Sequence, residues 1–266
     1  MPSELISRVT TVAGVGVGVV SINRPARRNA LTRDHDLQLE ALVQAHARNE
    51  EVRVVLITGE GPAFCSGADL SALRQAASAD QVAYDPASHL RYLYLTRLGK
   101  PVVAAIDGPA YGLGFALALH CDVRVLSPRA VFRAPFAELG LIAELGLPWL
   151  IARLAGQGRA FDWLLSSRTI DAREALATGL ASRILETEGF AQAALTHAAA
   201  LVAKASDRSL RVIKRQIWGV YQQSLAESEI DSGVETLAAI GSDDFRQRMA
   251  ALARPSSNPS PASDRA

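Results

Sequence analysis

The chain has 266 residues, of which 49% are hydrophobic, and its 28 basic side chains almost balance its 27 acidic ones. This length is enough for one large α/β domain, or for one domain with a helical appendage, and the composition supplies a substantial core. Because no long block of one sign of charge occurs, the sequence argues against nucleic acid or an anionic membrane as the main partner.

Cysteine content and hydropathy exclude several further classes of protein. Cys65 and Cys121 are too few for a disulfide framework, and no Cys/His spacing suggests a metal site. The N-terminal residues contain no apolar segment of the kind found in secretory signals. The most apolar stretch, residues 102–119, contains Asp107 and Pro109, which argues against a membrane span. We therefore expect a cytoplasmic protein without a bound metal.

The first half of the chain alternates predicted strands and helices. Four apolar runs have the pattern of strands: residues 14–22, 52–58, 102–106 and 123–126. Residues 32–46 read as a helix, with Asp34 and Asp36 near its positive N-terminal end. Such alternation predicts βαβ units with a largely parallel sheet, and hence an α/β fold.

From about Leu147 onward the sequence predicts helices almost exclusively. Asp171 and Glu174 form a helix-start capping pair, and Gly179 is a stop signal. Two further amphipathic helices are predicted at residues 190–204 and 209–224. The Pro/Ser/Asn-rich residues 255–266 are expected to be a disordered tail. We therefore divide the chain into a core of residues 1–195, a helical region of residues 196–254 and this tail.

Two glycine-bearing loops follow predicted buried strands. One runs from Gly61 to Leu70, and the other runs from Asp107 to Ala116 and opens a helix. Small residues at the carboxyl end of a strand let backbone N–H groups approach a ligand, and free N–H groups at a helix start stabilise negative charge. If each loop directs one N–H at the same oxygen, the two form an oxyanion hole. The alternative is that both are simply tight turns, since glycine is common after a strand.

A third stretch, residues 23–31, places three arginines around a proline in Asn-Arg-Pro-Ala-Arg-Arg-Asn-Ala-Leu. Arginine binds phosphate well, so this stretch is a candidate for meeting a phosphorylated ligand. The alternative is a solvated turn, which would be favoured if the stretch stood alone.

In order and spacing, these motifs resemble the enoyl-CoA hydratase/isomerase (crotonase) family. The resemblance rests on residues 23–31, on Phe-Cys-Ser-Gly-Ala-Asp-Leu at residues 64–70 and on residues 107–122, and it extends over roughly residues 9–249. It implies a ββα-repeat spiral core with a C-terminal helical trimerisation region, assembled as trimers or dimers of trimers. It also implies acyl-CoA thioesters as ligands, with no cofactor besides the coenzyme A of the substrate.

The resemblance further implies which residues form the thioester site. By position, the oxyanion N–H groups would be those of Ala68 and Leu113; the family often has glycine where this chain has Leu113, but only the backbone N–H is required. The residues implied to bind the coenzyme A thioester are Ala26, Arg28, Ala63, Ser66, Gly67, Asp69, Leu70, Tyr111, Gly112 and Phe136.

The carboxylates distinguish branches of the family. The hydratase branch uses two glutamates, and at their positions this chain has Ala116 and Phe136. Because hydration needs groups that activate and orient water, this departure argues against simple hydration. The segment from Leu139 to Trp149 instead resembles the part of enoyl-CoA isomerases that carries a single catalytic acid, and Glu144 falls at its position. One carboxylate can move a proton between two carbons, which shifts a double bond.

Glu144 is the candidate base because its sequence neighbours are apolar, among them Ile142, Ala143, Leu145 and Leu147. If these side chains enclose it, desolvation raises the pKa of the carboxyl toward the range useful for a general base. The alternative is a residue that only meets the dipole of the following helix. Glu138 is a weaker candidate, expected to point to solvent.

Other candidate groups are weaker. Gly14-Val-Gly-Val-Gly18 lacks the spacing and the following helix of a dinucleotide loop, and it is interpreted as a twisted strand. Ser66 and Cys65 lack the Gly-x-Ser-x-Gly context of a nucleophile. His89 could border the acyl pocket, and Lys214 could approach the coenzyme A nucleotide from a neighbouring subunit, although a solvated position is favoured for this lysine.

Three hypotheses follow from the sequence. The first, which is favoured, is a crotonase-fold enzyme that shifts a double bond or otherwise passes through a thioester enolate, with Glu144 as base. The second is an enoyl-CoA hydratase with an atypical arrangement of acid and base. The third is a catalytically silent acyl-CoA-binding oligomer.

Overall fold

The computed structural model describes residues 3–69, 71, 74, 78 and 90–252. The chain divides into two compact units, Met1–Arg215 and Gln216–Ala266. This division falls later than the expected one after residue 195. The reason is that helix α9 (Phe190–Val202) spans that position and packs Ala194, Ala198 and Val202 into the core of the first unit. The predicted tail, residues 255–266, lies outside the described residues.

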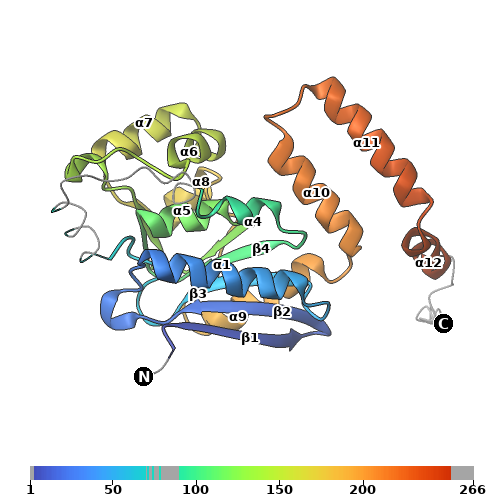
Figure 1. Cartoon of the computed structure of the whole chain (residues 1–266), viewed down its shortest axis with the longest axis horizontal. Helices are drawn as coiled ribbons and strands as arrows, with labels where there is room; N and C mark the ends of the chain where they lie inside the picture. The colour runs from blue at the N-terminus through green and yellow to red at the C-terminus, as the bar shows by residue number, and fades with distance from the viewer. Residues whose placement is uncertain (1–2, 70, 72–73, 75–77, 79–89, 253–266) are drawn as a thin grey trace, which may run out of the picture. The chain divides into compact units, whose positions relative to one another are not determined.

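The first unit is built on a six-stranded sheet in the order β1-β2-β3-β4-β6-β9 (Figure 1). Its strands are β1 (Leu5–Val12), β2 (Val15–Ile22), β3 (Val54–Gly59), β4 (Val102–Ile106), β6 (Val123–Leu126) and β9 (Arg183–Ile184). β1 and β2 pair antiparallel and the other neighbours pair parallel, which confirms the largely parallel sheet. The four predicted strands correspond to β2, β3, β4 and β6, whereas the sequence did not predict β1 or β9.

Helices cover both faces of this sheet. Val17 and Val19 of β2 belong to a buried cluster with α9. A Cβ on Gly18, between them, would lie 2.6 Å from Cγ of His46 in helix α1 (Arg33–Arg48). Successive residues of a strand point to opposite faces, so α1 and α9 lie on opposite sides of the sheet (Figure 1). Gly18 thus lets β2 pack closely against α1, and Gly16 and Gly18 lie in a strand, as interpreted from the sequence.

Local helix signals in the sequence are confirmed. Helix α1 begins after Thr32, whose side chain caps it. Helix α8 (Ala172–Ala177) begins after Asp171, whose carboxylate accepts the Glu174 N–H at 2.8 Å. The predicted helix 190–204 is α9, and the predicted helix 209–224 is shorter at its C-terminal end. The other helices that begin in the first unit are α4 (Leu93–Arg97), α5 (Leu113–His120), α6 (Leu147–Ala155), α7 (Gln157–Ser166) and α10 (Asp207–Gly219).

A second, three-stranded sheet lies beyond the carboxyl ends of the parallel strands. It has the order β5-β7-β8, with β5 (Pro109–Tyr111), β7 (Val131–Arg133) and β8 (Ile170–Asp171). β5 follows β4 directly and leads into α5. It also receives a parallel bridge from Cys65 to Ala110, so the loop that leaves β3 joins this small sheet.

Lys214 of α10 is buried, which contradicts both roles considered for it. Its Nζ donates to the carbonyls of Leu95 at 2.7 Å and Lys100 at 3.0 Å, and it pairs with Asp122 Oδ2 at 2.7 Å. The same Asp122 oxygen accepts the Val102 N–H at 2.7 Å. With three partners in the core, this ammonium is neither solvated nor able to reach a nucleotide; it fixes α10 to α4, β4 and β6.

Replacing Lys214 by methionine is therefore expected to lower the free energy of unfolding by about 3–5 kcal/mol, because it leaves the Asp122 carboxylate without its buried partner. Urea unfolding of the two proteins measures the change. Lys204→Met makes the same chemical change at an exposed position and should cost about 0.5 kcal/mol or less. Equal costs at the two lysines would contradict the structural role of Lys214.

The second unit contains α11 (Leu225–Ile240) and α12 (Asp243–Leu252). Ser224 and Glu227 form a reciprocal capping box at the start of α11. Neither helix has a buried residue, although each carries large apolar side chains. Within the described residues, no helix is both long enough and apolar enough to cross a membrane.

Candidate active site

Two loops meet at the carboxyl ends of β3 and β4. The Cys65 N–H donates to the Pro109 carbonyl at 3.0 Å, and the Tyr111 N–H donates to the Cys65 carbonyl at 2.9 Å. Gly114 lets α5 approach this junction, since a Cβ there would lie 2.2 Å from the Cys65 carbonyl oxygen. The two glycine-bearing loops singled out in the sequence are therefore adjacent in space.

The loops bring two backbone N–H groups close together. Leu113 is the first residue of α5, and Gly112 before it has φ +51° and donates its own N–H to Arg133. A Cβ built on Gly67 would lie 3.7 Å from the Leu113 nitrogen. Within the described residues, neither Leu113 nor Ala68 donates its N–H to an acceptor. Free N–H groups at the start of a helix attract an anionic oxygen, so this arrangement can bind negative charge.

The turn from Asn23 to Leu31 packs against the first glycine-bearing loop, which begins at Gly61. The Ser66 N–H donates to the Arg28 carbonyl at 3.0 Å, and the buried Asn29 amide donates to the Ala63 carbonyl at 2.6 Å. Arg27 and Arg28 are exposed, as is Ala26. Arg24 instead turns inward and forms an ion pair. Of the three arginines, two are thus available to a ligand and one is part of the structure of the turn.

Predicted binding residues occupy both the surface and the interior of this region. Tyr111 and Ser66 are half-buried, whereas Ala63 is buried. The Phe136 ring approaches the second loop, with Cζ 4.0 Å from a Cβ built on Gly112. The predicted residues Leu70 and His89 lie outside the described residues.

Asp69 was predicted to bind the ligand, but its side chain is engaged internally. Its carboxylate accepts two hydrogen bonds from Ser71 and pairs with Arg24. These bonds, those from Ser71 first, lower the pKa of the carboxyl to about 2. The Asp69 carboxylate is therefore engaged within the loop, and its predicted binding role stays a prediction.

Glu144 lies on the loop that starts at Phe136 and ends at α6. The Leu141 N–H donates to the Phe136 carbonyl at 2.8 Å, which folds this loop back on its start. Glu144 is half-buried, and the next two residues, Leu145 and Gly146, both have left-handed backbone angles, with φ +54° and +68°. A bulky residue such as leucine rarely adopts this conformation, and such strain concentrates at functional sites.

The expected apolar enclosure of Glu144 is only partial. Leu145 and Leu147 are buried, but Ile142 is 84% exposed and does not cover the carboxylate within this chain. Glu138 is half-exposed and its carboxylate accepts two hydrogen bonds from Arg133, at 2.5 and 2.6 Å. Ala116 is fully buried on α5 and offers no carboxylate. Of the two candidate acids on this loop, Glu144 has no recorded partner for its side chain within the described residues.

The cysteines do not supply a nucleophile. Cys65 and Cys121 are both buried and free. Burial raises the pKa of each thiol to about 12, so both are protonated at neutral pH. In the part of the chain that the structure describes, no group of three or more His, Cys, Asp or Glu side chains could hold a metal ion.

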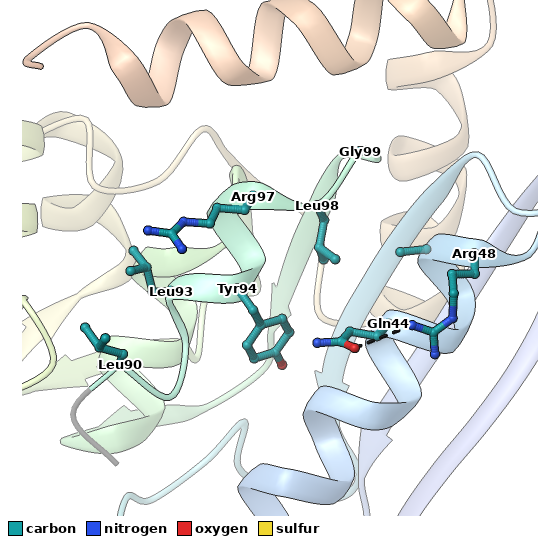
Figure 2. A pocket seen from close by; sticks show the side chains of 9 residues that line it. Gln44, Arg48, Leu90, Leu93, Tyr94, Arg97, Leu98 and Gly99 are labelled. Carbon is teal, nitrogen blue, oxygen red and sulfur yellow. Dashed lines mark hydrogen bonds between the residues drawn. The ribbon is translucent and has the colours of Figure 1, made fainter. Parts of the chain in front are cut away.

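A hollow of about 480 Å³ lies apart from these loops, between α1 and α4 (Figure 2). Figure 2 shows the Tyr94 ring of α4 facing the Gln44 amide of α1, whereas the Arg97 side chain points away from α1. It is lined by Gln44, Ala47, Arg48, Leu90, Leu93, Tyr94, Arg97, Leu98 and Gly99. None of the residues predicted to bind acyl-CoA lines this hollow.

Comparison with known proteins agrees with the fold. The family model for enoyl-CoA hydratase/isomerase matches residues 13–251. "Probable enoyl-CoA hydratase echA12" of Mycobacterium leprae (strain TN) is 36% identical over 233 residues, which cover 84% of this chain and 78% of that protein. The 4-chlorobenzoyl coenzyme A dehalogenase-2 of an Arthrobacter species is 30% identical, with 88% and 86% of the two chains covered.

A solved structure of a probable enoyl-CoA hydratase/isomerase from Mycobacterium abscessus superposes with a TM-score of 0.81 at 33% identity, covering 94% of this chain and 95% of that one. The architecture is therefore the crotonase-like α/β fold, in which strand-end loops meet at a helix start. The chain belongs to the enoyl-CoA hydratase/isomerase family and is an acyl-CoA enzyme.

Proposed function

We propose that this enzyme converts 3-enoyl-CoA to 2-enoyl-CoA through a thioester enolate, with Glu144 as the base that moves the proton. The observation that carries the proposal is the set of carboxylates. Glu144 lies on a strained loop that begins beside Gly112. By the resemblance, it falls at the position of the single acid of the isomerases, whereas Ala116 and Phe136 fall at the two hydratase positions.

In this proposal the N–H groups of Ala68 and Leu113 bind the thioester oxygen. Deprotonation beside the thioester places negative charge on that oxygen, and two fixed donors stabilise this charge without reorganisation. Glu144 takes the proton from one carbon and returns it to another, so no water has to be activated.

The remaining parts of the site follow from the same chemistry. The exposed Arg27 and Arg28 offer charge to the phosphates of coenzyme A, for which arginine is well suited. The thioester itself accepts the electron pair, so we propose that no further cofactor or metal takes part. The cytoplasmic location stays a prediction.

Product analysis with two substrates tests the reaction. The enzyme is incubated with a 3-enoyl-CoA and, separately, with the 2-enoyl-CoA of the same chain length, in deuterated water. Mass spectrometry then distinguishes isomerised product, which has the mass of the substrate apart from exchanged deuterium, from hydrated product, which gains one water. We expect isomerisation to be faster than hydration; faster hydration would contradict the proposal.

Hydration is the second candidate because curated relatives carry hydratase names. It requires a water-positioning group other than the two missing glutamates. A silent acyl-CoA-binding protein is distinguished by the same experiment, since it would exchange no proton beside the thioester. The dehalogenase relative acts on an aromatic thioester by its name, so an aromatic acyl-CoA belongs in the panel.

We also propose that the enzyme is a trimer or a dimer of trimers. Helix α11 carries a stripe of apolar side chains at helical spacing: Ile230, Val234 and Leu237, which are 67%, 64% and 74% exposed. Three such residues on one face of a helix favour burial against another protein surface.

Sedimentation at micromolar concentration is expected to give three or six times the monomer mass. Leu237→Lys should shift the protein toward smaller species, because it places a charge in the apolar stripe. Glu229→Lys is the control. It introduces a lysine about a quarter turn of the helix from Ile230, outside the apolar stripe, and should leave assembly intact. A stable monomer of the unchanged protein would contradict the proposed assembly.

A further inference from the structure

Arg24 joins the turn at residues 23–31 to the loop that carries Ala68. Its side chain is 11% exposed, and its NH1 pairs with Asp69 Oδ2 at 3.2 Å. The same nitrogen donates to the Ala30 carbonyl, and Nε donates to Glu4 Oε1 at 3.1 Å. Glu4 is 56% exposed and Asp69 only 7%, so the buried contact of this guanidinium is with Asp69.

The Asp69 carboxylate is fixed from its other side as well. Oδ1 accepts the Ser71 N–H at 3.0 Å and the Ser71 hydroxyl at 2.7 Å. Arg24 contacts one oxygen and Ser71 the other, so the carboxylate is held from both sides. The backbone of Asp69 is held accordingly.

The backbone on both sides of Ala68 is bonded to Leu31. The Leu31 N–H donates to the Gly67 carbonyl at 2.9 Å, and the Asp69 N–H donates to the Leu31 carbonyl at 2.9 Å. In an extended segment successive N–H groups point to opposite sides, so the Ala68 N–H points away from Leu31. The direction of this N–H is therefore set by how Gly67 and Asp69 sit against the turn.

The other end of the same loop is held by Asn29. The Arg24 N–H donates to Asn29 Oδ1 at 2.8 Å, and Asn29 Nδ2 donates to the carbonyls of Glu60 at 3.0 Å and Ala63 at 2.6 Å. Arg24 is thus fixed through its backbone to the start of the loop and through its side chain to the end of it.

We propose that Arg24 is a positioning residue, which holds the Ala68 N–H in place for the thioester oxygen by clamping Asp69. This inference rests on the proposed oxyanion hole. The clamp has a second effect, because an unpaired carboxylate one residue from Ala68 would oppose the negative charge that develops on the oxygen. Arg24 cancels that charge.

Kinetics of Arg24→Gln test the clamp. A donor must lie about 2.7–3.1 Å from the oxyanion, and misplacement by about 1 Å costs roughly 100-fold in rate, so we expect kcat to fall by roughly 10- to 100-fold. KM should change little, because the interaction strengthens in the transition state. The kcat of Arg24→Lys should lie between those of the unchanged enzyme and Arg24→Gln. An ammonium can pair with Asp69, but it cannot hold the other acceptors as a guanidinium does.

Two further variants separate the clamp from simple loss of stability. Glu4→Gln removes the charge of the exposed partner of the same guanidinium and should keep kcat unchanged. Asp69→Asn breaks the same ion pair but leaves no unpaired carboxylate beside Ala68, so it should lower kcat less than Arg24→Gln does. The double variant should be no worse than Arg24→Gln alone, because both substitutions break the same contact. Urea unfolding identifies any variant that has lost its fold. Additive losses, or an effect of Glu4→Gln as large as that of Arg24→Gln, would overturn the clamp.

A spectroscopic readout does not depend on turnover. Butanoyl-CoA labelled with ¹³C at the thioester carbonyl is bound to each protein, and the infrared frequency of that carbonyl is compared with its value in water. Donors that bind the oxygen lower the frequency; we expect a clear downshift in the unchanged enzyme and a smaller one in Arg24→Gln. A downshift that Leu113→Pro reduces and Arg24→Gln preserves would overturn the clamp alone. No downshift in the unchanged enzyme would overturn both the oxyanion hole and the clamp.

Discussion

A Glu144→Gln variant is expected to lose isomerisation of 3-enoyl-CoA by about 10²–10⁴-fold, the range typical of removing a general acid or base. Glutamine has the same shape but cannot take up the proton. KM for the substrate should stay close to that of the unchanged enzyme, because binding of the coenzyme A part of the substrate does not depend on the Glu144 side chain. Steady-state rates with 3-enoyl-CoA, followed by separation of the two isomers, measure the loss.

Glu138→Gln is the matched control for this variant. It makes the same substitution six residues away, on a carboxylate that is paired with Arg133. It should retain most of the activity. Hydration that survives Glu144→Gln would contradict both the reaction and the base, and equal losses at the two glutamates would point to a structural role for this loop.

A Leu113→Pro variant is expected to lose roughly 10²–10³-fold in rate, because proline removes the N–H proposed to bind the thioester oxygen. Proline is sterically acceptable in the first turn of a helix, so α5 can still form. Leu113→Ala keeps the donor and should retain most of the activity. Rates with 3-enoyl-CoA measure both variants.

The proline could also disturb Gly112, since the residue before a proline is restricted. Folding and oligomeric state are therefore measured beside the kinetics. Equal losses for alanine and proline would indicate that the Leu113 side chain acts through packing. A folded and fully active Leu113→Pro enzyme would rule out this oxyanion hole.

The parallel core could be predicted because its strands are continuous apolar runs. β3, β4 and β6 are mainly buried, and such strands are recognisable from sequence alone. β1 has Ser7, Arg8 and two threonines among its eight residues, because it is an edge strand with little burial. Its pairing is set by the turn at Ala13 and Gly14, both with positive φ, and a sequence pattern of period two hardly reveals it.

The site could be predicted where its chemistry is local. The glycine loops signalled close backbone approach, and the structure brings those loops together. The ion pair between Arg24 and Asp69 could not be predicted, because the two residues are 45 positions apart and only the fold pairs them. Lys214 left a weak signal: it lies four residues after Leu210, which packs against the core, and hence on the same side of α10.

Cys65 sits at the junction of the two loops, with its backbone bonded to Pro109 and Tyr111 and its thiol fully enclosed. A protonated, enclosed sulfur does not react with alkylating agents or mild oxidants, because the thiolate is the nucleophile. Modification of this residue requires the loops to separate first. Its labelling rate therefore reports how often the loops open while the rest of the molecule stays folded. Cys65 is therefore a built-in probe of local opening at the candidate site.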